Sequence, residues 1–337
     1  MTNPDGSARY AFVSFLMLND SYLPGALTVA YALQRQETGA DRVCMVTEDV
    51  SPDARHALGL LYDRVVDVPK LYVPHKRRQA RQDRPYMFTR MNALRLGADG
   101  DLGCAYEKLV VLDADVLPLK HYAHLLTLPA PAGILNEARA HFVETDEDGQ
   151  YVIPESVDRD GTWKWHRLYG EVCPHGAPIP AEITDRIAQD PLNLGINGGL
   201  FVFEPSMDEY RAILEDVQRP ETLHRVGDLY DWPEMQYLTL RWSGRWTNVD
   251  LRFAGLNGYP RLSVLYGTHF GGLKPWQFKR QSAIARWGRY ADFQLWFRTY
   301  VEMVQDAYPA LLGVRRLKRL LDQIDDLNQS LRDQGLI

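Results

Sequence analysis

The stretch KLVVLDADVLPLK, residues Lys108 to Lys120, decides the fold of this chain. Residues 109–112 form an apolar run without polar alternation, which is typical of a central strand in a mostly parallel sheet with helices on both faces. The run stops at Asp113 and Asp115. Because side chains alternate along a strand, we expect both carboxylates to point the same way and Ala114 to point to the other face. One divalent cation could then contact both aspartates, beyond the strand end where such sheets bind ligands.

The composition narrows the class of protein. With 337 residues, the chain is long enough for one large α/β domain or two smaller ones. A net charge of −6 gives no electrostatic reason to expect a nucleic-acid partner. Three widely spaced cysteines indicate neither a disulfide framework nor a cysteine zinc site, and they favour a reducing compartment. Because the N-terminus is polar and no apolar run of about 18 residues occurs, we expect a cytoplasmic protein without a membrane anchor.

Strands and helices are expected to alternate along the first part of the chain. Apolar runs predict strands at residues 10–18, 42–47, 65–68 and 133–136. A helical pattern starts at Pro24, and Ser51 followed by Pro52 is a typical start for a helix that we expect to reach Tyr62. This alternation predicts a parallel sheet with right-handed connections.

Two segments lack periodicity. Residues 70–85 are basic, which predicts a solvated surface loop or, alternatively, a lid over an anionic substrate. Met87 to Leu96 then resumes a helix that carries Arg90. Residues 138–192 form an irregular connection with an acidic patch at 144–148, and a connection of this length within a domain is usually functional or partly disordered.

Capping signals mark two later helices. Ser206 and Glu209 have the spacing of a capping box before a helix that reaches Val217. Asp231 and Glu234 repeat this spacing before the next helix. Glu234 is therefore explained equally well as a member of a capping box and as a functional carboxylate.

Several apolar features in the second half of the chain favour packing roles. The spacing of Trp232, Trp242 and Trp246 favours core packing over stacking on sugars. Residues 262–266 predict a late strand. The last helix carries an apolar seam that packs either on its own domain or across a homodimer, formed by Leu317, Leu320, Ile324, Leu327 and Leu331.

Four motifs, in order, resemble glycosyltransferase family 8, the glycogenin-like retaining sugar transferases. They are Leu18-Asn19-Asp20-Ser21-Tyr22, Asp113-Ala114-Asp115, Asn197-Gly198-Gly199 and the stretch HFGGLKPW from His269 to Trp276. Alone, an Asp-x-Asp sequence also fits a solvated turn, and a lone histidine is more often a hydrogen-bonded core or surface residue. The combination, which spans residues 10–280, favours a functional site for both.

The resemblance implies an α/β fold of the GT-A type, with a Rossmann-like, mostly parallel sheet and helices on both faces. It also implies a UDP-sugar as donor and Mn²⁺, or alternatively Mg²⁺, as cofactor. The GT-A domain would span residues 8–280, with 138–192 as an insertion near the acceptor site. Residues 281–337 would form a C-terminal helical extension.

The resemblance also implies roles for individual residues. Asp113, Asp115 and His269 would be metal ligands. Arg90 stands where the family usually has a lysine near the donor diphosphate, and a guanidinium can bind phosphate bidentately. The nucleotide sugar would contact Leu18, Asn19, Tyr22, Arg90, Asp113, Ala114, Asp115, Asn197, Gly198, His269, Gly272 and Lys274. The catalytic candidates are Asn197, Glu234 and Gln236.

One departure from the family lies beside the reacting sugar. The family commonly has Asp-Gln where this chain has Glu234-Met235, with Gln236 one place later. Methionine cannot hydrogen-bond a sugar hydroxyl as glutamine does. Position 235 therefore bears on which donor sugar is used.

We expect a metal-dependent retaining enzyme that moves a hexose from a UDP-sugar to an acceptor hydroxyl on a glycan or a protein. One alternative is a self-glycosylating primer, for which Tyr259 is the best-placed acceptor. Another alternative is an inactive GT-A domain that serves as a scaffold, although the presence of all three expected metal ligands argues against it.

Overall fold

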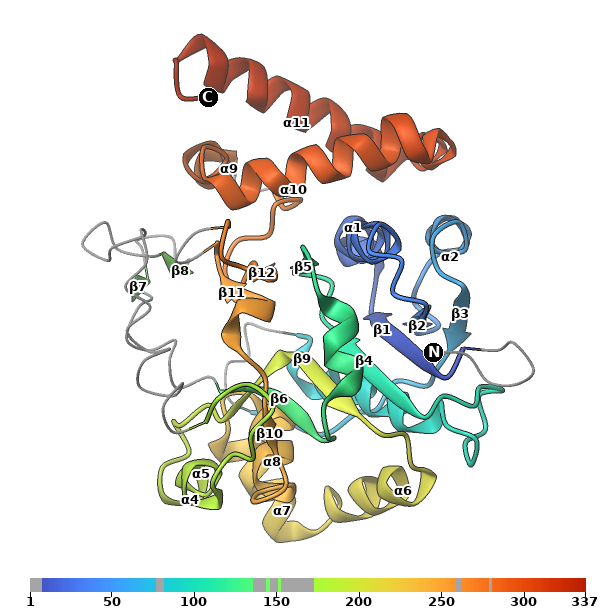
Figure 1. Cartoon of the computed structure of the whole chain (residues 1–337), viewed down its shortest axis with the longest axis vertical. Coiled ribbons are helices and arrows are strands. Elements are labelled where there is room, and N and C mark those ends of the chain that lie inside the picture. The colour runs from blue at the N-terminus through green and yellow to red at the C-terminus, as the bar shows by residue number, and fades with distance from the viewer. Residues whose placement is uncertain are drawn as a thin grey trace.

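The computed structural model describes residues 8–76, 82–135, 144–145, 151–152, 173–258, 262–278 and 281–337. Most of the segment 138–192 and the candidate self-acceptor Tyr259 therefore lie outside the described residues. Figure 1 shows how the described helices and strands are arranged.

A seven-stranded sheet forms the centre of the fold, in the order β10-β6-β9-β4-β1-β2-β3. Its strands are β1 (Tyr10–Leu16), β2 (Asp41–Val46), β3 (Arg64–Asp67), β4 (Lys108–Leu112), β6 (Ala132–Leu135), β9 (Ile196–Phe203) and β10 (Thr247–Asn248). Neighbouring strands are parallel except at β9, which runs antiparallel to both β4 and β6. The predicted α/β class with a mostly parallel sheet is confirmed.

A smaller sheet lies beyond the end of β4. It contains β11 (Gly255–Leu256), β12 (Gly267–His269) and β5 (Val116–Pro118), in that order. A separate antiparallel pair is formed by β7 (Glu144–Thr145) and β8 (Tyr151–Val152). The strand predicted at 262–266 is wrong: the strand begins at Gly267 because residues 267–269 pair antiparallel with β5.

Helices connect these strands. The α-helices are α1 (Leu23–Gln34), α2 (Pro52–Leu58), α4 (Ala181–Thr184), α5 (Arg186–Gln189), α6 (Met207–Asp216), α7 (Pro220–His224), α8 (Pro233–Arg241), α9 (Gln281–Trp287), α10 (Ala291–Glu302) and α11 (Arg315–Asp333). The 3-10 and π segments are η1 (Asp20–Tyr22), η2 (Arg84–Arg95), η3 (Tyr122–Thr127), η5 (Arg225–Leu229), η6 (Leu251–Ala254), η8 (Met303–Ala307) and η9 (Pro309–Gly313). The short helices α4 and α5 correct the expectation that residues 138–192 are irregular throughout. No helix in the described part of the chain is long and apolar enough to cross a membrane.

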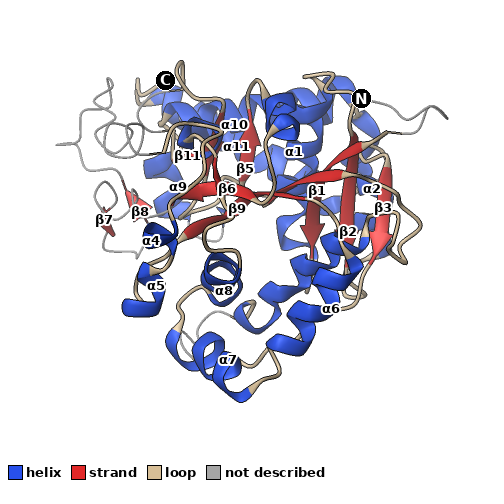
Figure 2. Ribbon diagram, turned by 60° about the horizontal axis from the view of Figure 1, so that its bottom comes forward, coloured by secondary structure: helices blue, strands red, loops and turns tan. Residues whose placement is uncertain are grey.

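The sheet is covered on both faces. Side chains of β2 alternate between two cores: Cys44 and Val46 pack with α1 and α2, whereas Val43 and Met45 pack with η2 and α8. Figures 1 and 2 show α1 and α2 on one side of the sheet and α6, α7 and α8 on the other. This two-sided burial explains why residues 109–112 of β4 are apolar without alternation.

The start of α1 packs closely against the turn that follows β4. A Cβ atom at Gly25 would lie 2.4 Å from the carbonyl oxygen of Ala114 and 2.4 Å from the Trp276 ring. Only glycine allows so close an approach at this point. The first helix therefore supports the turn that carries Asp113 and Asp115.

The predicted capping boxes have different outcomes. The hydroxyl of Ser206 accepts a hydrogen bond from the backbone N–H of Glu209 at 3.2 Å, so the first cap is confirmed. The helix α8 instead begins after Trp232, whose side chain does not cap it. The predicted N-cap position is therefore wrong, and the Glu234 carboxylate pairs with Arg90.

The C-terminal helices pack on the rest of the chain. The apolar seam of α11 is buried in the same core as α1 and α10. The Tyr31 hydroxyl of α1 donates a hydrogen bond to Glu302 of α10 at 2.9 Å, and Arg35 forms an ion pair with Glu302 at 2.9 Å. Packing on its own domain thus accounts for the seam, and a homodimer formed through the C-terminal helices stays a prediction.

We predict that Ile324→Ala lowers the free energy of unfolding by about 2–5 kcal/mol, because Ile324 is fully buried and its loss leaves a cavity. Urea denaturation measures this change. Lys318→Ala, on the exposed face of the same helix, is the matched control and should change the midpoint little. An unchanged midpoint in Ile324→Ala, accompanied by loss of a dimer in light scattering, would show that the seam is intermolecular.

Candidate active site

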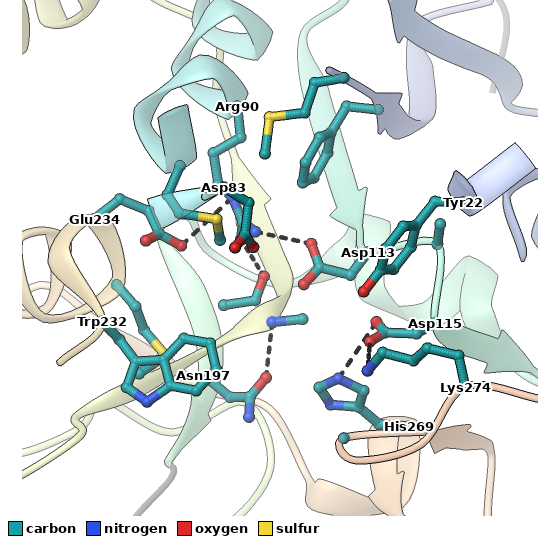
Figure 3. A pocket seen from close by; sticks show the side chains of 18 of the residues that line it. Tyr22, Asp83, Arg90, Asp113, Asp115, Asn197, Trp232, Glu234, His269 and Lys274 are labelled. Carbon is teal, nitrogen blue, oxygen red and sulfur yellow. Dashed lines mark hydrogen bonds and ion pairs between the residues drawn. The ribbon is translucent and has the colours of Figure 1, made fainter. Parts of the chain in front are cut away.

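A cavity of about 360 Å³ lies at the carboxyl end of β4. Most of the residues expected to form the site line it: Leu18, Asn19, Tyr22, Arg90, Asp113, Ala114, Asp115, Asn197, Gly198, Glu234, His269 and Lys274. Figure 3 shows how the labelled side chains of this group surround the cavity. Two expected site residues, Gln236 and Gly272, are not among its lining residues.

The antiparallel direction of β9 explains how distant motifs meet. Because β9 runs opposite to β4, its first residues lie beside the last residues of β4. The backbone N–H of Asp113 donates to the carbonyl oxygen of Gly199 at 3.0 Å. The strand β12 similarly runs antiparallel to β5, and the N–H of Phe270 donates to the Asp115 carbonyl at 2.9 Å, which places His269 beside Asp115.

Asp113 and Asp115 belong to a turn and not to the strand. β4 ends at Leu112, and the N–H of Val116 donates to the Asp113 carbonyl at 3.0 Å, which closes the turn. The expectation that the two carboxylates share one strand face is therefore wrong in its geometry. Both side chains still line the same cavity, but each has a different cationic partner.

Arg90 joins three groups on one wall of the cavity. Its guanidinium forms an ion pair with Asp113 at 2.9 Å and with Glu234 at 3.6 Å, and it donates to the carbonyl oxygen of Gly198. The Arg90 side chain is only 1% exposed, and its guanidinium carbon lies 5.0 Å from the centroid of the Phe15 ring. These contacts use the guanidinium to position protein groups. Because Arg90 also lines the cavity, its expected contact with the donor diphosphate stays a prediction.

The carboxylate of Glu234 is buried in the same wall of the cavity as Arg90. Its side chain is 1% exposed, and Oε1 pairs with Arg90. Its second oxygen, Oε2, is buried without a hydrogen-bond partner in the described structure. Buried acceptors without a partner are uncommon in proteins, so Oε2 is suited to accept a hydroxyl hydrogen from a bound molecule.

Asp115 lies at the other end of the cavity. Its Oδ2 forms an ion pair with Lys274 Nζ at 2.5 Å, and Oδ1 lies 3.4 Å from His269 Nε2. Lys274 Nζ also donates to the carbonyl oxygen of Phe270 at 2.5 Å. This lysine is thus held at the cavity wall by the loop that follows β12.

The two aspartates differ in their electrostatic surroundings. Burial raises the pKa of Asp113 to about 7, although the charge of Arg90 acts in the opposite direction. Burial also acts to raise the pKa of Asp115, but the charges of Lys274 and His269 outweigh it and hold that pKa well below its usual range. Asp115 is therefore a firmly ionised carboxylate near neutral pH.

The two glycines of the Asn-Gly-Gly motif leave room for this arrangement. A Cβ atom at Gly198 would lie 3.0 Å from Arg90 Nη1, and a Cβ atom at Gly199 would lie 2.7 Å from His269 Cε1. Asn197 accepts a hydrogen bond from the Gly199 N–H at 2.7 Å, which fixes the bend of the motif. Larger residues here would push the charged groups apart.

Gln236 has a structural role. Its Nε2 donates to the carbonyl oxygens of Pro191 at 2.6 Å and Asn193 at 2.9 Å, and its Oε1 accepts from the Trp232 N–H at 2.8 Å. The side chain therefore points away from the cavity, which corrects its place among the catalytic candidates. Met235, its neighbour, does line the cavity.

The Leu18-Asn19 segment forms the end of the cavity near Tyr22. Leu18 has a positive φ of 67°, a conformation that non-glycine residues rarely adopt. Its N–H donates to the Thr47 hydroxyl at 3.2 Å, and Asn19 accepts from the Ser21 N–H at 2.8 Å. These hydrogen bonds hold the segment in a defined shape along the cavity.

The basic segment 70–85 lies only partly within the described residues. His75 Nε2 lies 2.9 Å from the Tyr230 carbonyl oxygen, and Arg84 is buried with its guanidinium carbon 3.4 Å from the centroid of the Trp232 ring. These residues correct the expectation that the whole segment is a solvated loop.

Several lining residues were not predicted from the sequence, among them Asp83 and Trp232. Asp83 belongs to the basic segment 70–85, in which an acidic side chain stands out little. Trp232 lines the cavity, whereas Trp242 and Trp246 are buried in the core as expected. The signal was Pro233: a proline at the first helical position places Trp232 before the helix, so helical spacing does not apply to it.

Known proteins resemble this chain over most of its length. It is 26% identical over 279 residues to the uncharacterized protein R707 of Acanthamoeba polyphaga mimivirus, which covers 80% of this chain and 83% of that protein. It is 24% identical over 289 residues to galactinol synthase 1 of Ajuga reptans, which covers 82% of this chain and 76% of that protein. The glycogenin of Neurospora crassa is 29% identical over 115 residues, 34% of this chain and 16% of that protein. No protein-family model matches the chain.

Solved structures with a similar arrangement are more distant in sequence. The galactosyltransferase LgtC, in complex with donor and acceptor sugar analogs, aligns with 84% of this chain and 94% of its own, at a TM-score of 0.46 and 13% identity. The apo form of mouse xyloside xylosyltransferase 1 aligns with 86% of this chain and 93% of its own, at a TM-score of 0.41 and 12% identity.

Galactinol synthases match more than four fifths of this chain, and a glycogenin matches about a third of it. Residues of all four motifs meet in one cavity beside a mostly parallel sheet. These similarities support the resemblance to glycosyltransferase family 8.

Proposed function

We propose that this protein is a metal-dependent retaining glycosyltransferase that moves a hexose from a UDP-sugar to an acceptor hydroxyl. The observation that supports this best is the pairing of charges around one cavity: Arg90 with Asp113 and Glu234 on one wall, and Lys274 with Asp115 on the other. Each wall thus carries both a cation and a carboxylate. This arrangement suits a substrate with an anionic diphosphate at one end and hydroxyl groups at the other.

The residues present fit a divalent cation. Asp115 Oδ1 is buried without a hydrogen-bond partner in the described structure and faces His269 Nε2 at 3.4 Å. Carboxylate oxygen with imidazole nitrogen is a donor set that suits a small transition-metal ion such as Mn²⁺ better than Ca²⁺. Asp113, Asp115 and His269 would hold the ion, although the described residues contain no preformed group of three or more histidine, cysteine or acidic ligands.

The chemistry follows from where the charges lie. A bound cation supplies positive charge that stabilises the departing diphosphate. Lys274 Nζ, held at the wall by the Phe270 carbonyl, adds a second positive charge at the same end. Glu234, at the other end, binds hydroxyl groups of the donor sugar through Oε2 and lies beside the reacting centre. For retention we favour a same-face mechanism over a double displacement: the acceptor hydroxyl attacks from the face that the diphosphate leaves, and the leaving phosphate accepts its proton.

The donor is assigned to the UDP-sugar class. The segment Leu18-Asn19 with Tyr22 forms a shaped end of the cavity, and the chain has neither a Gly-x-Gly-x-x-Gly dinucleotide motif nor a P-loop. The resemblance to family 8 points the same way. The identity of the donor sugar depends on Met235. The identity of the acceptor depends on the residues at the cavity mouth.

We predict that UDP with Mn²⁺ raises the melting temperature of the wild-type protein, whereas ATP with Mn²⁺ does not, because a specific ligand stabilises the folded state. Asp115→Asn should remove most of the Mn²⁺ dependence of UDP binding, measured by calorimetry. A release assay with a set of UDP-sugars then tests turnover with and without a chelator. Stabilisation by ATP alone, or full turnover in excess chelator, would contradict the proposal.

We predict that Arg90→Lys lowers the transfer rate by on the order of 100-fold, because a single ammonium cannot hold Asp113, Gly198 and Glu234 together. The dissociation constant for UDP with Mn²⁺ should change little, since Arg90 contacts protein groups. Arg95→Lys, on the same helix but outside the cavity, is the matched control. A large loss of UDP affinity with an unchanged rate would show instead that Arg90 binds the diphosphate.

We predict that Met235→Gln changes the ratio of kcat/KM between UDP-sugars more than it changes UDP affinity. Met235 lines the cavity beside Gly198, and an amide there can pair with sugar hydroxyls that methionine leaves unpaired, a difference of about 1–3 kcal/mol. Gln236→Met is the matched control: it should lower stability, because Gln236 holds the backbone at Pro191 and Asn193, without changing the ratio. Equal ratios in wild type and Met235→Gln would limit Met235 to packing.

A further inference from the structure

Trp232 stands apart from the other tryptophans of its region. Trp242 and Trp246 are 3% and 0% exposed and pack in the core, whereas Trp232 is only half-buried and lines the active-site cavity. It precedes the first turn of α8, two residues before Glu234. Part of the indole packs against the same core, but core packing does not explain the part that lines the cavity.

The ring is held by groups behind it. The Arg84 guanidinium carbon lies 3.4 Å from the centroid of the indole, and the Arg84 side chain is itself buried. A buried guanidinium stacked on an indole is a strong cation–π contact. The backbone N–H of Trp232 also donates to Gln236 Oε1, and the Gln236 amide nitrogen donates to the carbonyl oxygens of Pro191 and Asn193, which fixes the backbone that carries the ring. The indole is thus a preorganised surface, which lowers the entropy lost when a ligand binds to it.

The position of Trp232 along the cavity indicates what it would bind. Glu234 and Met235 are 1% and 3% exposed and form the deep part of this wall, whereas Trp232 and Asp83 are only partly buried. Figure 3 shows Trp232 with Glu234 and Asn197, on the side away from Tyr22 and Lys274. With the diphosphate near Lys274 and the donor sugar near Glu234, the molecule that enters from the mouth is the acceptor.

We propose that Trp232, stacked on Arg84, is the binding platform for the ring of a carbohydrate acceptor. This inference rests on the proposed function. An indole binds the apolar C–H face of a pyranose, and the Asp83 carboxylate at the same mouth accepts hydrogen bonds from ring hydroxyls. The acceptor class is therefore a sugar with a free pyranose face. An extended peptide segment that presents a tyrosine would lack that face.

Fluorine NMR of the protein labelled with 5-fluorotryptophan tests this directly. The Trp232 resonance is the one that disappears in Trp232→Phe. With saturating UDP and diamagnetic Mg²⁺, the probes are methyl α-glucopyranoside and methyl β-galactopyranoside, with glycerol as the control polyol. We expect a pyranoside, but not glycerol, to shift the Trp232 resonance.

The variants add a measurement of affinity. Trp232→Ala should weaken pyranoside binding about tenfold, and Trp232→Phe, which keeps an aromatic face, should weaken it less. UDP affinity should be unchanged in both, as it should be in the control Leu192→Ala, an exposed apolar residue outside the cavity lining.

The possible outcomes separate the two hypotheses. If UDP binds but no pyranoside shifts the Trp232 resonance, or if Trp232→Ala binds pyranosides as well as the wild type, the platform is refuted and the proposed function stands. If Trp232→Ala does not fold, the wild-type resonance and Trp232→Phe decide the question. If UDP with Mg²⁺ or Mn²⁺ does not bind to the wild type, the proposed function itself fails.

Discussion

The buried charge of Arg90 is the constraint on which the active site depends. A guanidinium that is 1% exposed is costly to bury unless its hydrogen-bonding groups are satisfied by nearby acceptors. Asp113 and the Gly198 carbonyl accept hydrogen bonds from it, and Glu234 adds a compensating negative charge at 3.6 Å, so the three groups come from three different segments of the chain. Each of them is thereby fixed in place by the same group. The geometry of the cavity is therefore a consequence of how one buried cation is compensated, and the site cannot lose one member without disturbing the others.

The direction of a single strand makes this compensation possible. If β9 ran parallel to β4, its first residues would lie at the opposite edge of the sheet from Asp113. Because it is antiparallel, Gly198 and Gly199 lie beside the end of β4, where their lack of side chains admits Arg90 and His269. The small sheet applies the same principle to Asp115, since β12 pairs antiparallel with β5 and brings His269 and Lys274 to it. Two antiparallel strand pairings thus bring motifs that are distant in the sequence to the same cavity.

Much of the fold and most of the site residues could be predicted from the sequence, for reasons that differ between residues. The apolar run 109–112 is decisive because only a strand buried on both faces needs it. The motifs could be found because they are short and local. Which side chains pair with one another could not be predicted, because the pairing of Arg90 with Glu234 depends on tertiary packing that no local spacing encodes. The capping-box interpretation of Glu234 failed for this reason: a local rule matched, but a buried cation elsewhere in the chain competed for the same carboxylate.

The C-terminal helices support the site, although none of their residues lines the cavity. Their apolar seam is buried against α10, and α10 is bonded to α1 through Glu302, which pairs with Tyr31 and Arg35. The N-terminal end of α1 in turn presses Gly25 against the Ala114 carbonyl, within the turn between the two aspartates. A displacement of α10 or α11 would therefore also displace that turn, because close-packed interiors transmit displacement with little compression. Residues 281–337 are better understood as the outer support of the aspartate turn than as an appendage to a finished domain.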